Sequence, residues 1–167
     1  MDYNDYLIVP LVVGFEWFDE GLQNSLRARG WPTLTRPESM IMHHVIQGIV
    51  RPSDIARSLR LTRQAVHATI AQIVEKGVFE LQPDPADRRI RIVALTEMGK
   101  AMRADAQRIV TYLSLELGRR IGAKRLAALT DALRQDWGEP PEYPWESRGA
   151  PVMATRAARR TRSSSID

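Results

Sequence analysis

The stretch from residue 62 to 76 has the spacing of a helix with one polar and one apolar side. Its polar side carries Arg63, Gln64, His67 and the small Ala71. Its apolar side consists of Val66, Ile70, Ile73 and Val74. Arginine pairs well with guanine, and glutamine with adenine, in the major groove of DNA. The polar side therefore predicts base contacts, with Thr62 at the helix start contacting a phosphate. Taken alone, this side also fits an ordinary solvated surface.

A basic loop that follows this helix favours the first interpretation. Two strand-like runs, 78–82 and 90–95, are joined by prolines and aspartates that predict a β-hairpin. The tip carries Asp87, Arg88 and Arg89. Arginine suits the negative potential of a narrow minor groove, and Asp87 is expected to orient one arginine through a bidentate pair. A polar helix followed by a basic hairpin is less common by chance than either feature alone. The combination therefore favours DNA binding over an ordinary solvated surface.

The elements before the polar helix are expected to be helical. An apolar stripe marks a helix over residues 8–29, and its members are Leu11, Phe15, Phe18, Leu22 and Leu26. Thr35 and Glu38 form a capping box that begins a second helix. The buried side of that helix is predicted to be Ile41, Met42, Val45, Ile46 and Ile49. Pro52 and Ser53 begin a third helix, in which Ser53 is expected to contact a phosphate.

The elements after the polar helix follow the same logic. Gly77 is expected to end that helix, because glycine adopts the left-handed conformation at low cost. Thr96 begins a further helix, which Gly118 and Gly122 are predicted to interrupt, and a last helix covers about 123–137. Prolines and arginines over 138–167 predict a disordered tail, whose arginines either add phosphate contacts or serve as a solubilising end. We therefore expect one domain over 1–137.

Several runs of this sequence resemble the MarR family (multiple-antibiotic-resistance regulators) over roughly residues 8–137. The resemblance rests on the segments 53–66 (SDIARSLRLTRQAV), 75–78 (EKGV), 84–89 (DPADRR) and 95–99 (LTEMG). It implies a mainly α fold with a small β-hairpin wing, a winged helix-turn-helix with N- and C-terminal dimerisation helices. The DNA-binding lobe would cover about 36–96. The resemblance also implies a homodimer on a pseudo-palindrome in double-stranded DNA, most often as a repressor.

Many members of that family release DNA when a small aromatic acid or phenol binds beside the dimerisation helices. If the first two helices pack as the resemblance implies, an effector site would be lined by Trp17, Phe18, Met40, Met42, His43 and His44. The same residues also fit an ordinary core with partly exposed histidines. A metal site at the two histidines is not expected, because adjacent helical residues point about 100° apart and no third ligand is spaced to help.

The composition narrows the alternatives. A net charge of +4 with a pI of about 9.8 favours a polyanionic partner, and the absence of cysteine excludes disulfides and thiol-based sensing. No phosphate loop, metal motif or nucleophile elbow is present, so we expect no catalytic residues and no cofactor. The apolar run 7–13 is too short for a membrane span, which makes the cytoplasm the expected location. A winged-helix interaction module and a non-specific DNA binder without effector response remain as alternatives.

Overall fold

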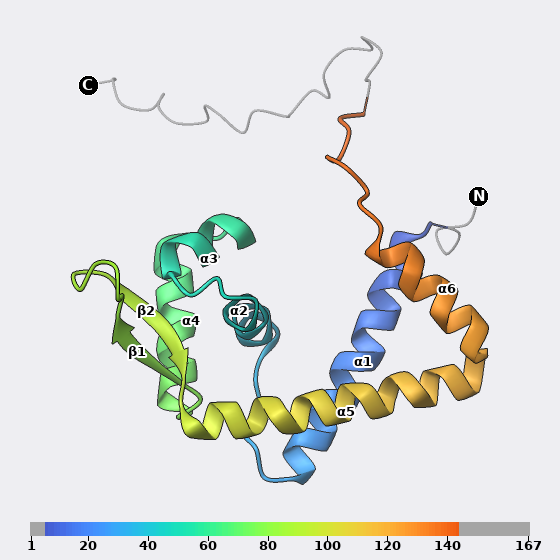
Figure 1. The fold of residues 1–167 in the computed structure, drawn as a ribbon, viewed down its shortest axis with the longest axis horizontal. Helices are drawn as coiled ribbons and strands as arrows, with labels where there is room; N and C mark the ends of the chain where they lie inside the picture. Colours follow the sequence, from blue (N-terminus) through green and yellow to red (C-terminus); the bar gives the residue numbers. More distant parts are fainter. Residues whose placement is uncertain (1–5, 144–167) are drawn as a thin grey trace, which may run out of the picture.

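The computed structural model describes residues 6–143. Its elements follow the chain as α1 (Ile8–Ala28), α2 (Arg36–Ile46), α3 (Pro52–Leu59), α4 (Arg63–Glu75), β1 (Phe79–Pro83), β2 (Arg91–Leu95), α5 (Glu97–Ile121) and α6 (Ala123–Arg134) (Figure 1). The two strands pair antiparallel, with Phe79 opposite Leu95 and Pro83 opposite Arg91. The predicted fold class, mainly helical with one β-hairpin wing, is confirmed.

The long helix α5 joins the two parts of the fold. Helices α2, α3 and α4 and the hairpin form a lobe at the start of α5, and α5 then extends past α1 to α6 (Figure 1). Within residues 6–143, no helix is both long enough and apolar enough to cross a membrane.

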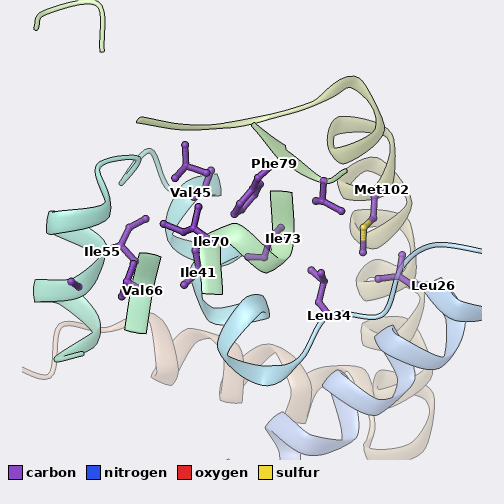
Figure 2. Close-up of a cluster of buried hydrophobic side chains, with 13 residues drawn as sticks. Leu26, Leu34, Ile41, Val45, Ile55, Val66, Ile70, Ile73, Phe79 and Met102 are labelled. Atoms are coloured by element: carbon purple, nitrogen blue, oxygen red, sulfur yellow. The ribbon is translucent and has the colours of Figure 1, made fainter. Parts of the chain in front are cut away.

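The lobe is held by a continuous apolar core (Figure 2). Its fully buried members come from α2, α3, α4 and the hairpin: Ile41, Ile55, Val66, Ile70, Ile73, Val78, Phe79 and Val93. Leu34, Leu26 and Met102 continue this core towards α1 and α5. Each such side chain contributes about 1.5–3 kcal/mol on burial. The core therefore fixes the buried side of α4, and with it the direction of the exposed side.

The helix ends confirm most of the predicted signals. Thr35 and Glu38 form the expected capping box, in which the Thr35 backbone N–H donates to the Glu38 carboxylate at 2.6 Å. The Thr62 hydroxyl accepts from the Ala65 N–H at 3.1 Å, and Thr96 caps α5 in the same way through the N–H of Gly99 at 3.0 Å. These caps satisfy backbone donors that the helices leave free.

Some predicted boundaries and burials were wrong. Helix α5 runs through Gly118 without interruption and ends before Gly122, whose φ is +95°. One glycine costs a helix only about 1 kcal/mol, and the added Cβ at Gly118 would lie 3.3 Å from Leu126 of α6, so glycine there permits close packing. The last helix ends at Arg134 instead of about 137, and Ile46, predicted to be buried, is exposed. Most of the predicted tail, from residue 144, lies outside the described residues.

Candidate nucleic-acid interface

The exposed side of α4 carries the polar residues that its spacing predicts. Arg63, Gln64 and His67 are all exposed, while Val66 on the opposite side is fully buried. Among the described residues, none of these three polar side chains takes part in a hydrogen bond or ion pair. Their donors and acceptors are therefore available to a ligand, and they lie in the first two turns of the helix.

The turn before α4 sets the angle at which this helix leaves α3. Arg60 ends α3 in the left-handed conformation with φ +53°, and the Leu61 N–H donates to the Ala56 carbonyl at 3.0 Å. A non-glycine residue in this conformation costs about 1–2 kcal/mol, so the surrounding packing must hold the turn. Ser53 lies on α3 and is half-buried, whereas Thr62 is exposed at the start of α4. The two predicted phosphate contacts thus come from different helices.

The base of the hairpin is braced by an ion pair that sequence reasoning missed. Asp84 is buried, and its Oδ2 accepts from Arg51 Nε at 2.7 Å and lies 2.6 Å from the terminal nitrogen of the same guanidinium. Its other oxygen accepts from the Ala86 N–H at 2.9 Å. These bonds, first that from Ala86 and then that from Arg51, hold the pKa of Asp84 below its usual value. The pair ties the wing to the residue that precedes α3.

The tip of the wing has a different local structure from the one predicted. The Asp87 carboxylate accepts from the Arg89 backbone N–H at 3.0 Å, so an Asx turn replaces the expected pair with a guanidinium. Arg88 and Arg89 are exposed, and within residues 6–143 neither has a carboxylate partner. The β2 strand is also tied to the lobe, because the Val93 N–H donates to the Val50 carbonyl at 2.9 Å. Two free guanidiniums therefore project from a wing with a fixed base.

A cavity of about 660 Å³ lies between α1, α2 and α5. It is mostly apolar, and the residues that line it include Leu22, Gln23, Leu26, Leu34, Ser39, Met42, His43, Ile46, Met102, Arg103, Ala106, Gln107, Val110 and Thr111. Of the predicted effector residues, only Met42 and His43 line it. The α5 contribution was missed, although the apolar spacing in the first half of α5 was a usable signal.

The other predicted effector residues have partners elsewhere. Trp17 and Phe18 pack edge to face at 5.0 Å between ring centroids, and the Arg120 guanidinium lies 5.6 Å from the Trp17 ring centre. His44 hydrogen-bonds to the Met40 carbonyl and the Ser58 hydroxyl, both at 2.9 Å. The His43 and His44 rings lie edge to face, with 6.2 Å between their centroids, but of the two only His43 lines the cavity.

Comparison with known proteins agrees with this geometry. Residues 33–90, which contain α2, α3, α4 and most of the wing, match the family model described as MarR family. Over these residues the chain is similar to the MarR family, and the similar segment is the winged helix. The resemblance predicted from the sequence is thereby confirmed, while a search of curated proteins gives no match.

Solved structures support the same fold beyond residues 33–90. The reduced form of MarR from E. coli is 23% identical, with a TM-score of 0.61 over 77% of this chain and 94% of that chain. CouR from Rhodococcus jostii RHA1, bound to p-coumaroyl-CoA, is 19% identical, with a TM-score of 0.59 over 80% and 93%. Bordetella bronchiseptica BpsR, whose DNA binding is regulated by 6-hydroxynicotinic acid, is 16% identical, with a TM-score of 0.58 over 80% and 94%. At these identities the likeness shows the fold, which includes the terminal helices.

Proposed function

We propose that this protein is a transcriptional regulator that binds a pseudo-palindromic site in double-stranded DNA as a homodimer and works in the cytoplasm. The observation that carries the proposal is the joint exposure of unpaired polar groups on α4 and on the wing. Arg63, Gln64 and His67 suit base edges in a major groove, and Arg88 and Arg89 suit the adjacent minor groove. Ser53 and Thr62 would contact phosphates, while Asp87 keeps the wing tip folded.

The proposal that the protein is a dimer rests on apolar surface that a single copy of the chain leaves exposed. Helix α6 has 12 residues and none of them is buried. A helix of this length is marginal in water unless an apolar face is packed. Exposed apolar side chains also gather on α1, α5 and α6, among them Val12, Val13, Phe15, Leu115, Leu129 and Leu133. A second copy of the chain would cover both the terminal helices and this surface.

Binding of a small organic anion in the cavity is the second part of the proposal. Its walls are mostly apolar, and Arg103, one of the residues that line it, has no ion pair among the described side chains. An apolar pocket with a cationic residue in its wall fits an acid with an apolar body. Occupation would release the DNA, which gives a repressor whose effector relieves repression.

The deciding experiment is selection of bound duplexes from a random DNA pool at near-physiological salt, read by sequencing. We expect enrichment of an inverted repeat with half-sites about 10–10.5 base pairs apart. The Gln64→Ala/His67→Ala variant should lose preference at particular positions, whereas the control Arg57→Ala, at an exposed pair with Asp54, should enrich the wild-type site. Weak, salt-sensitive binding without enrichment would leave a non-specific DNA binder, and no binding would leave an interaction module.

Sedimentation measures the dimer separately. Leu129→Glu/Leu133→Glu, which charges the exposed face of α6, should shift the chain to a monomer and weaken operator binding. Gln135→Glu, just beyond α6, adds the same type of charge outside this face and should remain dimeric. A wild-type chain that sediments as a monomer at micromolar concentration would contradict the dimer.

A further inference from the structure

One short segment separates the cavity from the C-terminal end of α4. Leu34 and Ser39 line the cavity. Gln23 of α1 hydrogen-bonds to both residues. Its Nε2 donates to the Ser39 hydroxyl at 3.4 Å, and its Oε1 accepts from the Leu34 N–H at 3.3 Å. Residues 33–39 therefore form a wall in which the Leu34 N–H and the Ser39 hydroxyl are already bonded to α1.

The other side of this segment holds Lys76, which directly follows α4. Its Nζ donates to both carboxylate oxygens of Glu38, at 2.7 and 2.6 Å, and to the Thr33 carbonyl at 2.9 Å. The Glu38 side chain is 1% exposed and that of Lys76 is 30% exposed. Burial raises the pKa of Glu38, but the bonds from Lys76 and Thr35 outweigh it and hold the pKa below its usual value. The carboxylate is therefore charged and fully bonded at neutral pH.

We propose that the Glu38–Lys76 pair couples the cavity wall to α4, with Lys76 acting as a positioning residue for Arg63, Gln64 and His67. The inference rests on the proposed function and deepens it by assigning the route of regulation. An occupant that displaces Ser39 or Leu34 moves the backbone next to Glu38. Through the pair, that movement reaches the end of α4.

The length of α4 turns a small tilt at Lys76 into a larger displacement at the N-terminal end of the helix. The helix has 13 residues, so its ends lie about 18 Å apart. A tilt of about 5° around the Lys76 end would move the N-terminal turn by about 1.6 Å. Base contacts tolerate displacements of only about 0.5 Å. The pair is thus placed where it can set sequence preference without touching DNA.

The first test measures positioning with fluorescence anisotropy of the full chain on its selected operator and on a scrambled duplex of equal composition. We expect Glu38→Gln and Lys76→Met each to lower the ratio of the two affinities by about threefold or more, with the double variant equal to either single one. Glu38→Gln raises the net charge, so simple electrostatics would strengthen binding to both duplexes. The control Lys100→Met, which breaks the exposed pair with Glu97, should leave the ratio unchanged.

Thermal unfolding of each variant separates positioning from loss of structure, because affinities are compared only where each variant is folded. A lower melting temperature with an unchanged affinity ratio would overturn the inference and leave the pair as a stabilising contact. A wild-type chain without operator preference would overturn the proposed function as well. If Glu38→Gln and Lys76→Met both kept the operator preference of the wild type, this inference would be overturned and the proposed function would stand.

The second test places an occupant in the cavity by substitution. Ala106→Phe, or Val110→Phe if the first variant does not fold, puts a ring among the cavity-lining residues. Each should lower operator affinity in the wild-type background. This loss of operator affinity should be smaller by about threefold or more in the Glu38→Gln background, because the Glu38–Lys76 pair is already broken there. An equal effect in both backgrounds, or none in the wild type, would overturn the coupling.

Discussion

Replacing Gly99 by alanine should destabilise this protein, although alanine is normally the better helix residue. Gly99 lies in the first turn of α5, where the helix meets the end of α4 and the start of β1. A Cβ at this position would lie 2.2 Å from the Val78 carbonyl oxygen and 3.1 Å from Leu95 Cδ2. The helix and the Val78 backbone would have to move apart by about 0.8 Å before the first contact reached 3.0 Å.

That movement disturbs hydrogen bonds at the same junction. The Val78 carbonyl accepts from the Thr96 N–H at 3.1 Å, and the Thr96 hydroxyl donates to the Gly77 carbonyl at 2.6 Å. Overpacking costs about 1–3 kcal/mol and each weakened hydrogen bond about 1 kcal/mol, against a gain of about 1 kcal/mol for alanine in a helix. We therefore expect Gly99→Ala to lower the free energy of unfolding by about 1–3 kcal/mol.

Urea unfolding followed by circular dichroism measures this free energy. The matched control is Gly14→Ala in α1, where the added Cβ meets no atom within 4 Å and the same substitution should stabilise the protein by up to about 1 kcal/mol. If Gly99→Ala were as stable as the wild type, the junction would have to relax without cost. The steric argument for glycine in the LTEMG segment would then be refuted.

Four further predictions concern the interface and its supports. Arg51→Met should weaken operator binding several-fold in anisotropy titrations, because it frees the base of the wing at Asp84; unchanged affinity would show that the Asx turn and strand pairing suffice. Arg89→Ala should weaken binding to operator and scrambled duplex alike and make the salt dependence shallower, and a loss confined to the operator would make Arg89 a specificity residue. Gln64→Ala should relax preference at particular bases by about 1–3 kcal/mol in competition assays, and a uniform loss would make it a positioning residue. Glu38 has a pKa below its ordinary 4.5 in the folded chain, so its contribution to stability is complete above pH 4.5 and is lost as the pH falls below that value. Glu38→Gln should therefore make the free energy of unfolding fall less steeply with pH below 4.5. An unchanged pH dependence would assign the acid sensitivity to other carboxylates.

Local patterns were enough to predict the helices, their caps and the two sides of α4. Each of these depends on residues within a few positions of one another, as in the capping box at Thr35 and the left-handed Gly77, whose φ is +73°. The exposed side of α4 was predictable for the same reason, because Val66, Ile70 and Ile73 define its buried side by their spacing. The wing was predictable from its turn residues to within one residue at the strand starts.

The braces between elements were not predictable in this way. Asp84 pairs with Arg51 across 33 residues, Glu38 with Lys76 across 38, and Asp105 with Arg29 across 76. Such partners meet only after the core has packed, and the spacing of residues within one segment cannot predict them. The cavity was predicted only in part for a related reason, since Met42 and His43 line it but Trp17 and Phe18 do not, and α5 supplies much of its wall.

Once these contacts between elements are known, two groups of basic residues can be distinguished by their partners. Arg29, Arg51 and Lys76 donate to the buried carboxylates of Asp105, Asp84 and Glu38, and the Trp31 indole also donates to Asp105 at 2.9 Å. Hydrogen bonds from Trp31 and then Arg29 hold the pKa of Asp105 below its usual value, so that charge stays in place at neutral pH.

The second group consists of basic residues whose charge is not neutralised within the part of the chain that the structure describes. It includes Arg63 at the start of α4 and Arg88 and Arg89 on the wing. A net charge of +4 counts both groups together and cannot tell them apart. Neutralised cations add little to the attraction of a polyanion, whereas each free cation placed against a phosphate releases a counterion. The case for DNA binding therefore depends on where the unpaired arginines lie. Arg63, Arg88 and Arg89 lie on the two elements that a winged helix presents to the duplex, whereas Arg103 lies at the cavity.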